Sequence, residues 1–74
     1  MSKLPIIKAK RLIKILKNLG FSPIRQEGSH IFFKHPDGRT TVIPYHPGRD
    51  IGRGLLRAII EDIKITPQQF EKLL

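Results

Sequence analysis

The chain has 74 residues, a length at which a domain buries only about 60% of the surface that its unfolded chain exposes, so its core must be thin. It contains no cysteine, which excludes disulfides, thiolate zinc sites and a thiol nucleophile. No apolar run approaches the roughly 20 residues that span a bilayer, and the first residues lack the apolar stretch of a signal peptide. We therefore expect one domain over residues 1–74, located in the cytoplasm.

Positive charge is concentrated in the first three quarters of the chain. The formal net charge is +8. Residues 1–57 hold 12 Lys/Arg against 3 Asp/Glu, a net of +9, and residues 58–74 contribute −1. A field of this sign attracts phosphate polyanions and is typical of nucleic-acid-binding proteins. A solubilising surface, or attraction to an acidic protein or a membrane, explains the same charge.

The spacing of apolar residues predicts an amphipathic helix over residues 8–19 with a basic outer face. Apolar residues recur there at three- and four-residue steps, and Lys10, Lys14 and Lys17 fall between them. These three lysines are candidate contacts for RNA phosphates. Ile15 falls on the polar side of the pattern, so we expect its side chain to be exposed.

Three short segments rich in β-branched and aromatic residues follow, at residues 22–26, 29–34 and 39–44. Glu27-Gly28 and Pro36-Asp37-Gly38 separate them and have the composition of hairpin turns. The sequence therefore predicts an antiparallel meander of three strands.

If each turn is a two-residue loop, the strands divide into a core face and an open face. The predicted core face holds Ile24, Ile31, Phe33 and Val42. The predicted open face holds Arg25, His30, Phe32, Lys34, Thr41 and Ile43. With a three-residue second loop, the two turns would no longer place these apolar residues on one core face.

Two helices are predicted after the strands. The first covers residues 51–63, and its buried stripe consists of Leu55, Leu56, Ile59, Ile60 and Ile63. Residues 66–69 combine an N-cap threonine, a first-turn proline and a capping-box glutamine, which predicts a short helix over residues 70–74. The fold class is therefore α+β, in the order helix, three antiparallel strands, helix, short helix.

Few side chains in this sequence can carry chemistry. The carboxylates show no local arrangement for a metal cluster and the histidines lack the spacing of a zinc site, so no metal ion or other cofactor is expected. Ahead of the second helix, Gly48, Gly52 and Gly54 lie beside Arg49 and Arg53, and exposed amides there are a candidate phosphate site. A loop that needs flexible turns explains these glycines equally well.

Gly28-Ser29-His30 places a histidine at the start of the middle strand, on the predicted open face. Imidazole has an unperturbed pKa of about 6.5, so it exchanges protons near neutral pH. Cleavage of RNA needs little more than such a proton-exchanging group. Deprotonating the 2′-hydroxyl lets that oxygen attack the adjacent phosphorus, while nearby cations stabilise the developing charge. A metal-free, histidine-dependent nuclease is therefore expected to prefer RNA. The alternative is a solvated strand histidine with no chemical role.

Other residues of the predicted open face complete this candidate site. Arg25 and Lys34 are candidates for holding phosphate. Phe32 and Ile43 are candidates for stacking a base or contacting a protein partner. The alternative for Phe32 is that the terminal helix covers it.

Four blocks of the sequence resemble successive blocks of the HicA (YcfA-like) toxin family: Leu19-Gly20-Phe21, Arg25 to His30 with Phe33, Thr41 to Gly48, and Gly54 to Ile59. The Gly-Ser-His block followed by Pro-x-His-Pro is more specific than any single motif in the chain. The resemblance covers nearly the whole chain. It implies a double-stranded-RNA-binding-domain-like fold, with the helices on one face of a three-stranded sheet.

The resemblance also implies an mRNA-cleaving toxin that a HicB-type antitoxin neutralises, and it identifies His30 as the catalytic histidine. His46 matches a recurrent family position, but no catalytic role is carried onto it; we expect it to hold the loop before the second helix. The usual threonine after the second-helix glycine is Leu55 here, which changes a possible helix cap. Without catalysis, the chain would be an RNA-binding module or a protein that acts within an antitoxin complex.

Overall fold

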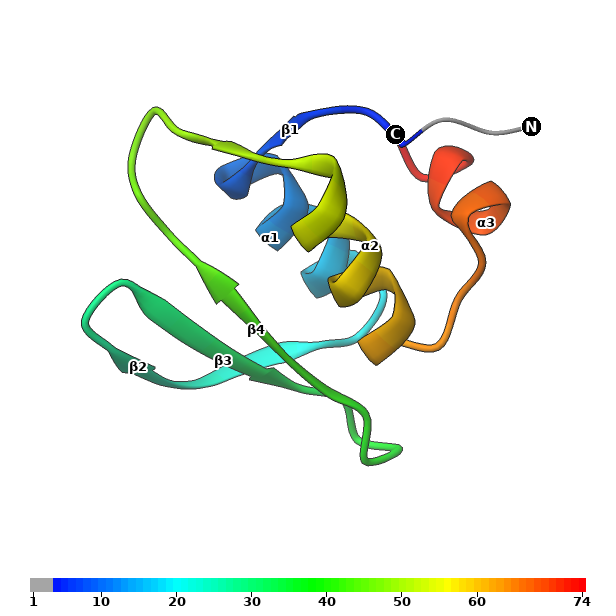
Figure 1. Ribbon diagram of the computed structural model, residues 1–74. Helices are drawn as coiled ribbons and strands as arrows, with labels where there is room; N and C mark the ends of the chain where they lie inside the picture. The colour runs from blue at the N-terminus through cyan, green and yellow to red at the C-terminus, as the bar shows by residue number, and fades with distance from the viewer. Residues whose placement is uncertain (1–3) are drawn as a thin grey trace.

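The computed structural model describes residues 4–74 and has an α+β architecture (Figure 1). Its elements are β1 (Ile7–Lys8), α1 (Ala9–Asn18), β2 (Ser22–Glu27), β3 (His30–Lys34), β4 (Thr40–Pro44), β5 (Asp50–Ile51), α2 (Arg53–Asp62) and α3 (Pro67–Glu71). Strands β2, β3 and β4 form an antiparallel sheet in that order, and α1 and α2 lie over one face of it. The predicted meander and the double-stranded-RNA-binding-domain-like arrangement are therefore confirmed. No helix within residues 4–74 is long and apolar enough to cross a membrane.

The core fills the space between the helices and the sheet. Its largest fully buried side chains come from both layers and from the segments that join them: Phe21, Phe33, Phe70, Leu12, Leu16, Ile43, Leu56, Ile59, Ile60 and Ile63. Burying one such side chain contributes roughly 1.5–3 kcal/mol. All of these residues belong to one contiguous cluster, so a thin core still joins every main element.

Helix α1 buries a wider face than its apolar spacing predicts. Ile15 is only 6% exposed, so the prediction that it lies on the polar side is wrong. Ile15 lines a hollow together with Leu73. Residues from the end of the chain therefore come close to this side of α1, a contact that the local sequence pattern does not contain.

Two short elements differ from their predicted bounds. Helix α2 begins at Arg53, two residues later than predicted, because Asp50–Ile51 pair with Ile7–Lys8 in an antiparallel ribbon. Nothing in the sequence pattern predicts this ribbon. Leu55 is 41% exposed and does not belong to the buried stripe of α2, whose other predicted members are buried.

Helix α3 begins with the predicted capping box. The Thr66 hydroxyl accepts a hydrogen bond from Gln69 N–H at 3.0 Å, and the Gln69 side-chain oxygen accepts one from Thr66 N–H at 2.7 Å. The helix spans Pro67–Glu71 rather than residues 70–74, and it buries Phe70 completely. It packs against α2 (Figure 1) and does not cover the face of the sheet that α1 and α2 leave open.

The first hairpin keeps the predicted faces although its turn differs. Glu27 pairs with His30, so the two loop residues are Gly28-Ser29. Compared with the predicted turn, the pairing of β2 with β3 is shifted by two residues, and an even shift leaves each side chain on its predicted face. Ile24 is an exception at 58% exposed. The register shifts just before Arg25, and the bulge turns Ile24 out of the core face.

The second connection is a three-residue loop, Pro36-Asp37-Gly38, rather than a two-residue turn. Pairing continues beyond the strands, because His35 N–H donates to Arg39 O at 2.8 Å. Gly38 has φ of 100°, a conformation that glycine adopts without strain. The extra residue shifts β4 by one position relative to β3, and a one-residue shift exchanges the faces of a strand.

This shift reverses the predicted faces of β4. Phe33 pairs with Thr41, and Phe32 pairs with Val42. Ile43 and Thr41 therefore lie on the core face, where they are 0% and 4% exposed, and Val42 lies on the other face. The prediction of Ile43 as a base or antitoxin contact is wrong, because the core encloses its side chain.

Arg39 fixes the β3–β4 loop to the rest of the molecule. Asp37 accepts hydrogen bonds from Arg39 N–H at 3.1 Å and from Arg39 Nε at 2.8 Å. Arg39 Nη1 also donates to Ile63 O, at the end of α2. The guanidinium lies over the Phe21 ring, with Cζ 5.1 Å from the ring centroid. The loop is thereby joined to α2 and to the start of the sheet.

His35 completes this structural cluster. Its Nε2 lies 3.1 Å from Leu19 O, and its Nδ1 lies 3.1 Å from Asp37 N. Nδ1 also lies 3.0 Å from Asp37 Oδ1, so the ring faces both the backbone and the carboxylate of Asp37. Its ring meets Phe21 edge-on, with 5.1 Å between the ring centroids. These contacts give His35 a structural role.

We predict that Gly20→Ala destabilises the fold through His35. Gly20 has φ of 102°, and a Cβ added there would lie 2.8 Å from His35 Nε2. The expected loss in the free energy of unfolding is about 1–3 kcal/mol in a urea titration. Gly54→Ala is the matched control, since a Cβ there meets nothing within 4 Å, and it should stabilise α2 by about 0.5–1 kcal/mol.

Gly38→Ala separates the strain of a positive φ from the clash with His35. Gly38 also has a positive φ, but a Cβ there meets nothing within 4 Å. Equal losses in Gly20→Ala and Gly38→Ala would show that the contact with His35 contributes nothing.

We predict that low pH weakens the β3–β4 loop through Asp37. The hydrogen bond from Arg39 N–H is the main cause that holds the pKa of Asp37 below its usual value of 3.8. A carboxyl whose folded pKa is lowered stabilises the fold above its unfolded pKa, and this contribution is lost as the pH falls through the folded pKa. In urea titrations, Asp37→Asn should unfold more easily than wild type at pH 7, and the difference should shrink at pH 3. A difference that does not change with pH would contradict this role of the carboxylate.

Candidate active site

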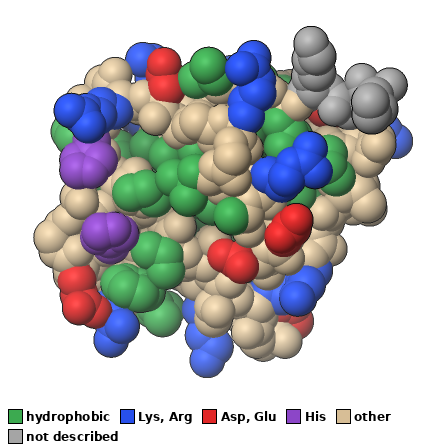
Figure 2. Space-filling model, viewed as in Figure 1, with side chains coloured by type: hydrophobic (Ala, Val, Ile, Leu, Met, Phe, Trp, Pro, Cys, Tyr) green, Lys and Arg blue, Asp and Glu red, His purple; other side chains and the backbone are tan. Residues whose placement is uncertain are grey.

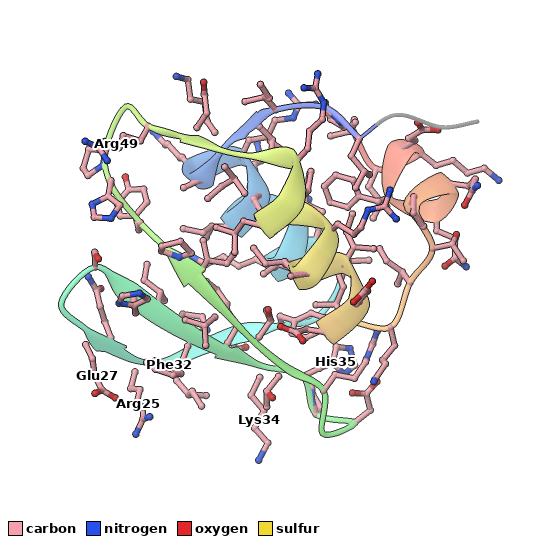
Figure 3. All side chains as sticks on the ribbon, viewed as in Figure 1. Arg25, Glu27, Phe32, Lys34, His35 and Arg49 are labelled. Carbon is pink, nitrogen blue, oxygen red and sulfur yellow. The ribbon has the colours of Figure 1, made fainter. Side chains whose placement is uncertain are left out.

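The open face is the surface of β2, β3 and β4 that the helices leave uncovered. Residues that pair directly across an antiparallel ladder share a face, so the register identifies its members: Arg25, Glu27, His30, Phe32, Lys34, Thr40, Val42 and Pro44. Figure 3 shows Arg25, Glu27, Phe32 and Lys34 pointing away from the helices. The structure thus brings together four predicted site residues: Arg25, His30, Phe32 and Lys34.

His30 is the first residue of β3, immediately after the Gly28-Ser29 turn. It lies between Glu27 on β2 and Pro44 on β4 and is exposed. Within residues 4–74, no hydrogen bond involves its imidazole, so its ring nitrogens are free to exchange a proton with a ligand. The short turn and two paired neighbours fix the backbone that carries this ring.

Arg25 and Phe32 form a flat stack beside His30. The Arg25 guanidinium carbon lies 4.3 Å from the centroid of the Phe32 ring, and Arg25 Nε lies 3.0 Å from Glu27 Oε2. An exposed ion pair of this kind adds little stability, but together these contacts orient the guanidinium. A planar cation held on an aromatic ring suits phosphate and base recognition.

A hollow of about 430 Å³ opens beside this stack. Its lining combines residues of all three strands with the last residue of α2: Ile24, Arg25, Phe32, Phe33, Thr40, Thr41, Val42 and Asp62. A volume of this size falls within the range of small-ligand sites. Phe32 is two residues along β3 from His30, which separates the two positions by about 7 Å. The hollow therefore adjoins Phe32 and Arg25, and His30 is not part of its lining.

The lysines of α1 lie away from this site. Lys10, Lys14 and Lys17 are exposed on the side of α1 that faces away from the core. Because α1 covers the opposite face of the sheet, these charges and His30 are on opposite sides of the core. The structure does not bring the predicted phosphate contacts of α1 into the same site as His30.

The two arginines before α2 have different surroundings. Arg53 Nε donates to Leu4 O at 2.8 Å, so Arg53 holds the N-terminal segment. Arg49 is exposed in the loop between β4 and β5 (Figure 3). Of the two, Arg49 is the better placed to meet a ligand that approaches the end of β4.

Lys8 holds the β4–β5 loop, a role that the sequence pattern does not reveal. Its Nζ donates to Gly48 O at 3.1 Å and lies 2.9 Å from Asp50 Oδ1. The His46 carbonyl accepts from Arg49 N–H at 3.0 Å. Within residues 4–74, no hydrogen bond involves the His46 imidazole. The hydrogen bonds that hold this loop come from Lys8 and from the backbone, including the His46 carbonyl; a role for the His46 side chain in holding it stays a prediction.

Within residues 4–74, no group of three or more His, Asp or Glu side chains is arranged to hold a metal ion. The site built from the geometry consists instead of one free imidazole, a guanidinium stacked on a phenyl ring, an exposed lysine and an adjoining hollow.

A sequence profile of the HicA toxin of bacterial toxin-antitoxin systems matches residues 9–65, which are 57 of the 74 residues. A comparison with curated proteins found no match. The matched range runs from the start of α1 past the end of α2, so it contains the whole open face and the β4–β5 loop. Because this match extends over more than half of its length, the chain belongs to the HicA toxin family and is a toxin of a toxin–antitoxin system.

Proposed function

We propose that this toxin is a metal-independent endoribonuclease that cleaves mRNA in the cytoplasm, with His30 as its catalytic acid–base group, and that a HicB-type antitoxin neutralises it. The observation that carries this proposal is the imidazole of His30, which is exposed and has no hydrogen bond within residues 4–74, on an open face that also presents Arg25 and Lys34. Membership of the HicA family supports the toxin role.

The proposed reaction uses the 2′-hydroxyl of RNA as nucleophile. His30 accepts the proton of this hydroxyl, the 2′-oxygen forms a bond to the adjacent phosphorus, and the bond from phosphorus to the 5′-oxygen breaks. The departing 5′-oxygen takes up a proton, either from the protonated His30 or from water. The products are a 2′,3′-cyclic phosphate and a chain that begins with a 5′-hydroxyl. DNA lacks the nucleophile, so the same site leaves DNA intact.

Arg25 and Lys34 supply positive charge at two distances from His30. Arg25 is a diagonal neighbour of His30 across the hairpin, which places the two positions about 7–8 Å apart. Its guanidinium therefore reaches the phosphate under attack and stabilises the charge that develops there. Lys34 is four residues along β3, about 13 Å from His30, where it suits a neighbouring phosphate of the same RNA strand.

Phe32 and the hollow beside it would receive a base next to the cleaved linkage. Unpaired bases stack on exposed aromatic rings, and this contact tolerates any base. A helical RNA would keep its bases stacked on one another. The open face therefore suits a single-stranded segment of mRNA.

An antitoxin that covers the open face would block the reaction directly. Ile24 is 58% exposed, and Phe32 and Val42 are partly exposed on the same surface. Apolar side chains that the core does not need are typical of a surface that a partner covers. Covering them would also close access to His30.

We predict that cleavage depends on His30 and on the 2′-hydroxyl. Wild-type protein in EDTA should cleave a labelled RNA and leave its all-deoxy counterpart intact. His30→Ala should reduce the rate about 10²- to 10⁴-fold, the usual contribution of one acid–base group. Its melting temperature should match wild type, because no hydrogen bond among residues 4–74 involves this imidazole.

Two results of this assay would contradict the nuclease. RNA binding without cleavage by either protein would identify an RNA-binding module. Full activity in His30→Ala would assign the cleavage to another residue or to a contaminant.

We predict that Phe32→Ala weakens RNA cleavage through the loss of base stacking. Removing a stacked ring costs about 1–3 kcal/mol per base, so kcat/KM should fall roughly 5- to 150-fold. Leu55→Ala is the control, because Leu55 is also an exposed apolar side chain but lies on α2. If Phe32→Ala loses antitoxin binding but cleaves RNA at the wild-type rate, the ring contacts only the protein partner.

A further inference from the structure

We propose that His46 is a second catalytic residue, which donates the proton to the leaving 5′-oxygen while His30 acts as the base. The inference rests on the proposed ribonuclease function and adds a group to the same site. It starts from two histidines whose side chains are exposed and make no hydrogen bond within residues 4–74.

The pairing of β3 with β4 continues past the end of β4 and carries His46 toward His30. His30 lies directly opposite Pro44. Tyr45 N–H donates to Ser29 O at 2.6 Å, so the ladder extends one residue further. His46 is thus the diagonal neighbour of His30 in this ladder, and such neighbours lie about 7–8 Å apart.

The alternation of side chains places both imidazoles on the same side. Pro44 lies on the open face with His30, and Tyr45 packs against the core. In an extended chain the next side chain returns to the first side, so His46 follows Pro44 toward the open face. Figure 2 shows two histidine side chains, separated by other atoms, on the side of the molecule that holds the β2–β3 turn and the β4–β5 loop.

The backbone at His46 is fixed, whereas its imidazole is free. Arg49 N–H donates to His46 O, and Lys8 binds Gly48 O and Asp50 at the base of the loop. Within residues 4–74, no hydrogen bond involves the His46 side chain. A proton donor needs this combination, because its position must be held while its N–H stays available to the substrate.

The chemistry needs two groups at separate positions. The attacking and leaving oxygens lie roughly in line on opposite sides of the phosphorus, so one imidazole cannot reach both without moving around the phosphate. His30 takes the proton from the 2′-oxygen as that oxygen bonds to phosphorus. The bond to the 5′-oxygen breaks, and protonated His46 gives its proton to that oxygen. His30 ends protonated and His46 neutral, and exchange with water restores both.

Charged groups surround each imidazole in a different way. Glu27 lies opposite His30, and Arg25 pairs with Glu27 at 3.0 Å. Arg49 lies in the same turn as His46, above the ion pair at the base of the loop. Because the base must be neutral and the acid protonated, kcat/KM should rise and then fall with pH.

The test uses a leaving group that needs no proton. The substrate is an RNA with one mapped cleavage site, prepared with oxygen or with sulfur at the 5′-bridging position of that linkage. His46→Gln should cleave the oxygen substrate at least about 10²-fold more slowly than wild type but cleave the sulfur substrate at nearly the wild-type rate, because a thiolate leaves without protonation. His30→Gln should lose activity toward both substrates. His46→Gln should also lose the fall in kcat/KM at high pH and keep the rise at low pH.

Each other outcome overturns a defined part of the proposal. Equal losses on both substrates would show that His46 only positions the loop, and unchanged cleavage of the oxygen substrate would show that it has no part in the reaction. Either result, with His30→Gln inactive, leaves the proposed function intact. A wild-type protein that cleaves neither substrate overturns both. The melting temperature of His46→Gln, and a second variant His46→Asn, distinguish a lost proton donor from a lost fold.

Discussion

The hydrogen bond from His35 N–H to Arg39 O closes the β3–β4 loop and sets the register between these strands. The position of every β4 side chain follows from it, because a shift of one residue would exchange the two faces of the strand. This register places Ile43 in the core and leaves Val42 on the open face. It also places the end of β4 beside the turn that carries His30. The contacts of Arg39 with α2 and with Phe21 secure the loop, so a structural cluster at one end of the sheet determines the geometry of the site at the other.

The chain uses one face of its sheet for stability and the other for chemistry. Both main helices cover the same face. The fully buried side chains of residues 4–74 lie between these helices and the sheet, in the segments that join them, or, in the case of Phe70, on α3 where it packs against α2. The open face is then free to carry an aromatic ring, cations and an unbonded imidazole without cost to the core. The positive charge is divided in the same way. The lysines of α1 place positive charge on the side of the molecule formed by the helices, whereas Arg25 and Lys34 share the open face with His30.

Features that depend on local sequence could be predicted, and features that depend on distant contacts could not. Helix α1, the first hairpin and the capping box of α3 each follow from a pattern within a few residues. Pro36-Asp37-Gly38 is compatible with a two-residue or a three-residue loop, so the face of Ile43 could not be decided from composition. Ile15 is buried beside residues from the end of the chain, and the β1–β5 ribbon joins segments with no periodicity of their own. His30 and Phe32 were placed correctly because the error in the first turn was an even number of residues.

The proposed mechanism depends on the ladder rather than on a buried network of supporting residues. Enzymes usually orient a catalytic imidazole by a hydrogen bond to its second nitrogen, yet neither His30 nor His46 has such a partner within the described residues. Here the paired backbones of β3 and β4 can set the separation of the two rings, and the substrate supplies the remaining contacts. Within residues 4–74, no helix lies over the open face. A partner that covers this face would therefore control the reaction by closing access to both rings, which fits a toxin that an antitoxin holds inactive.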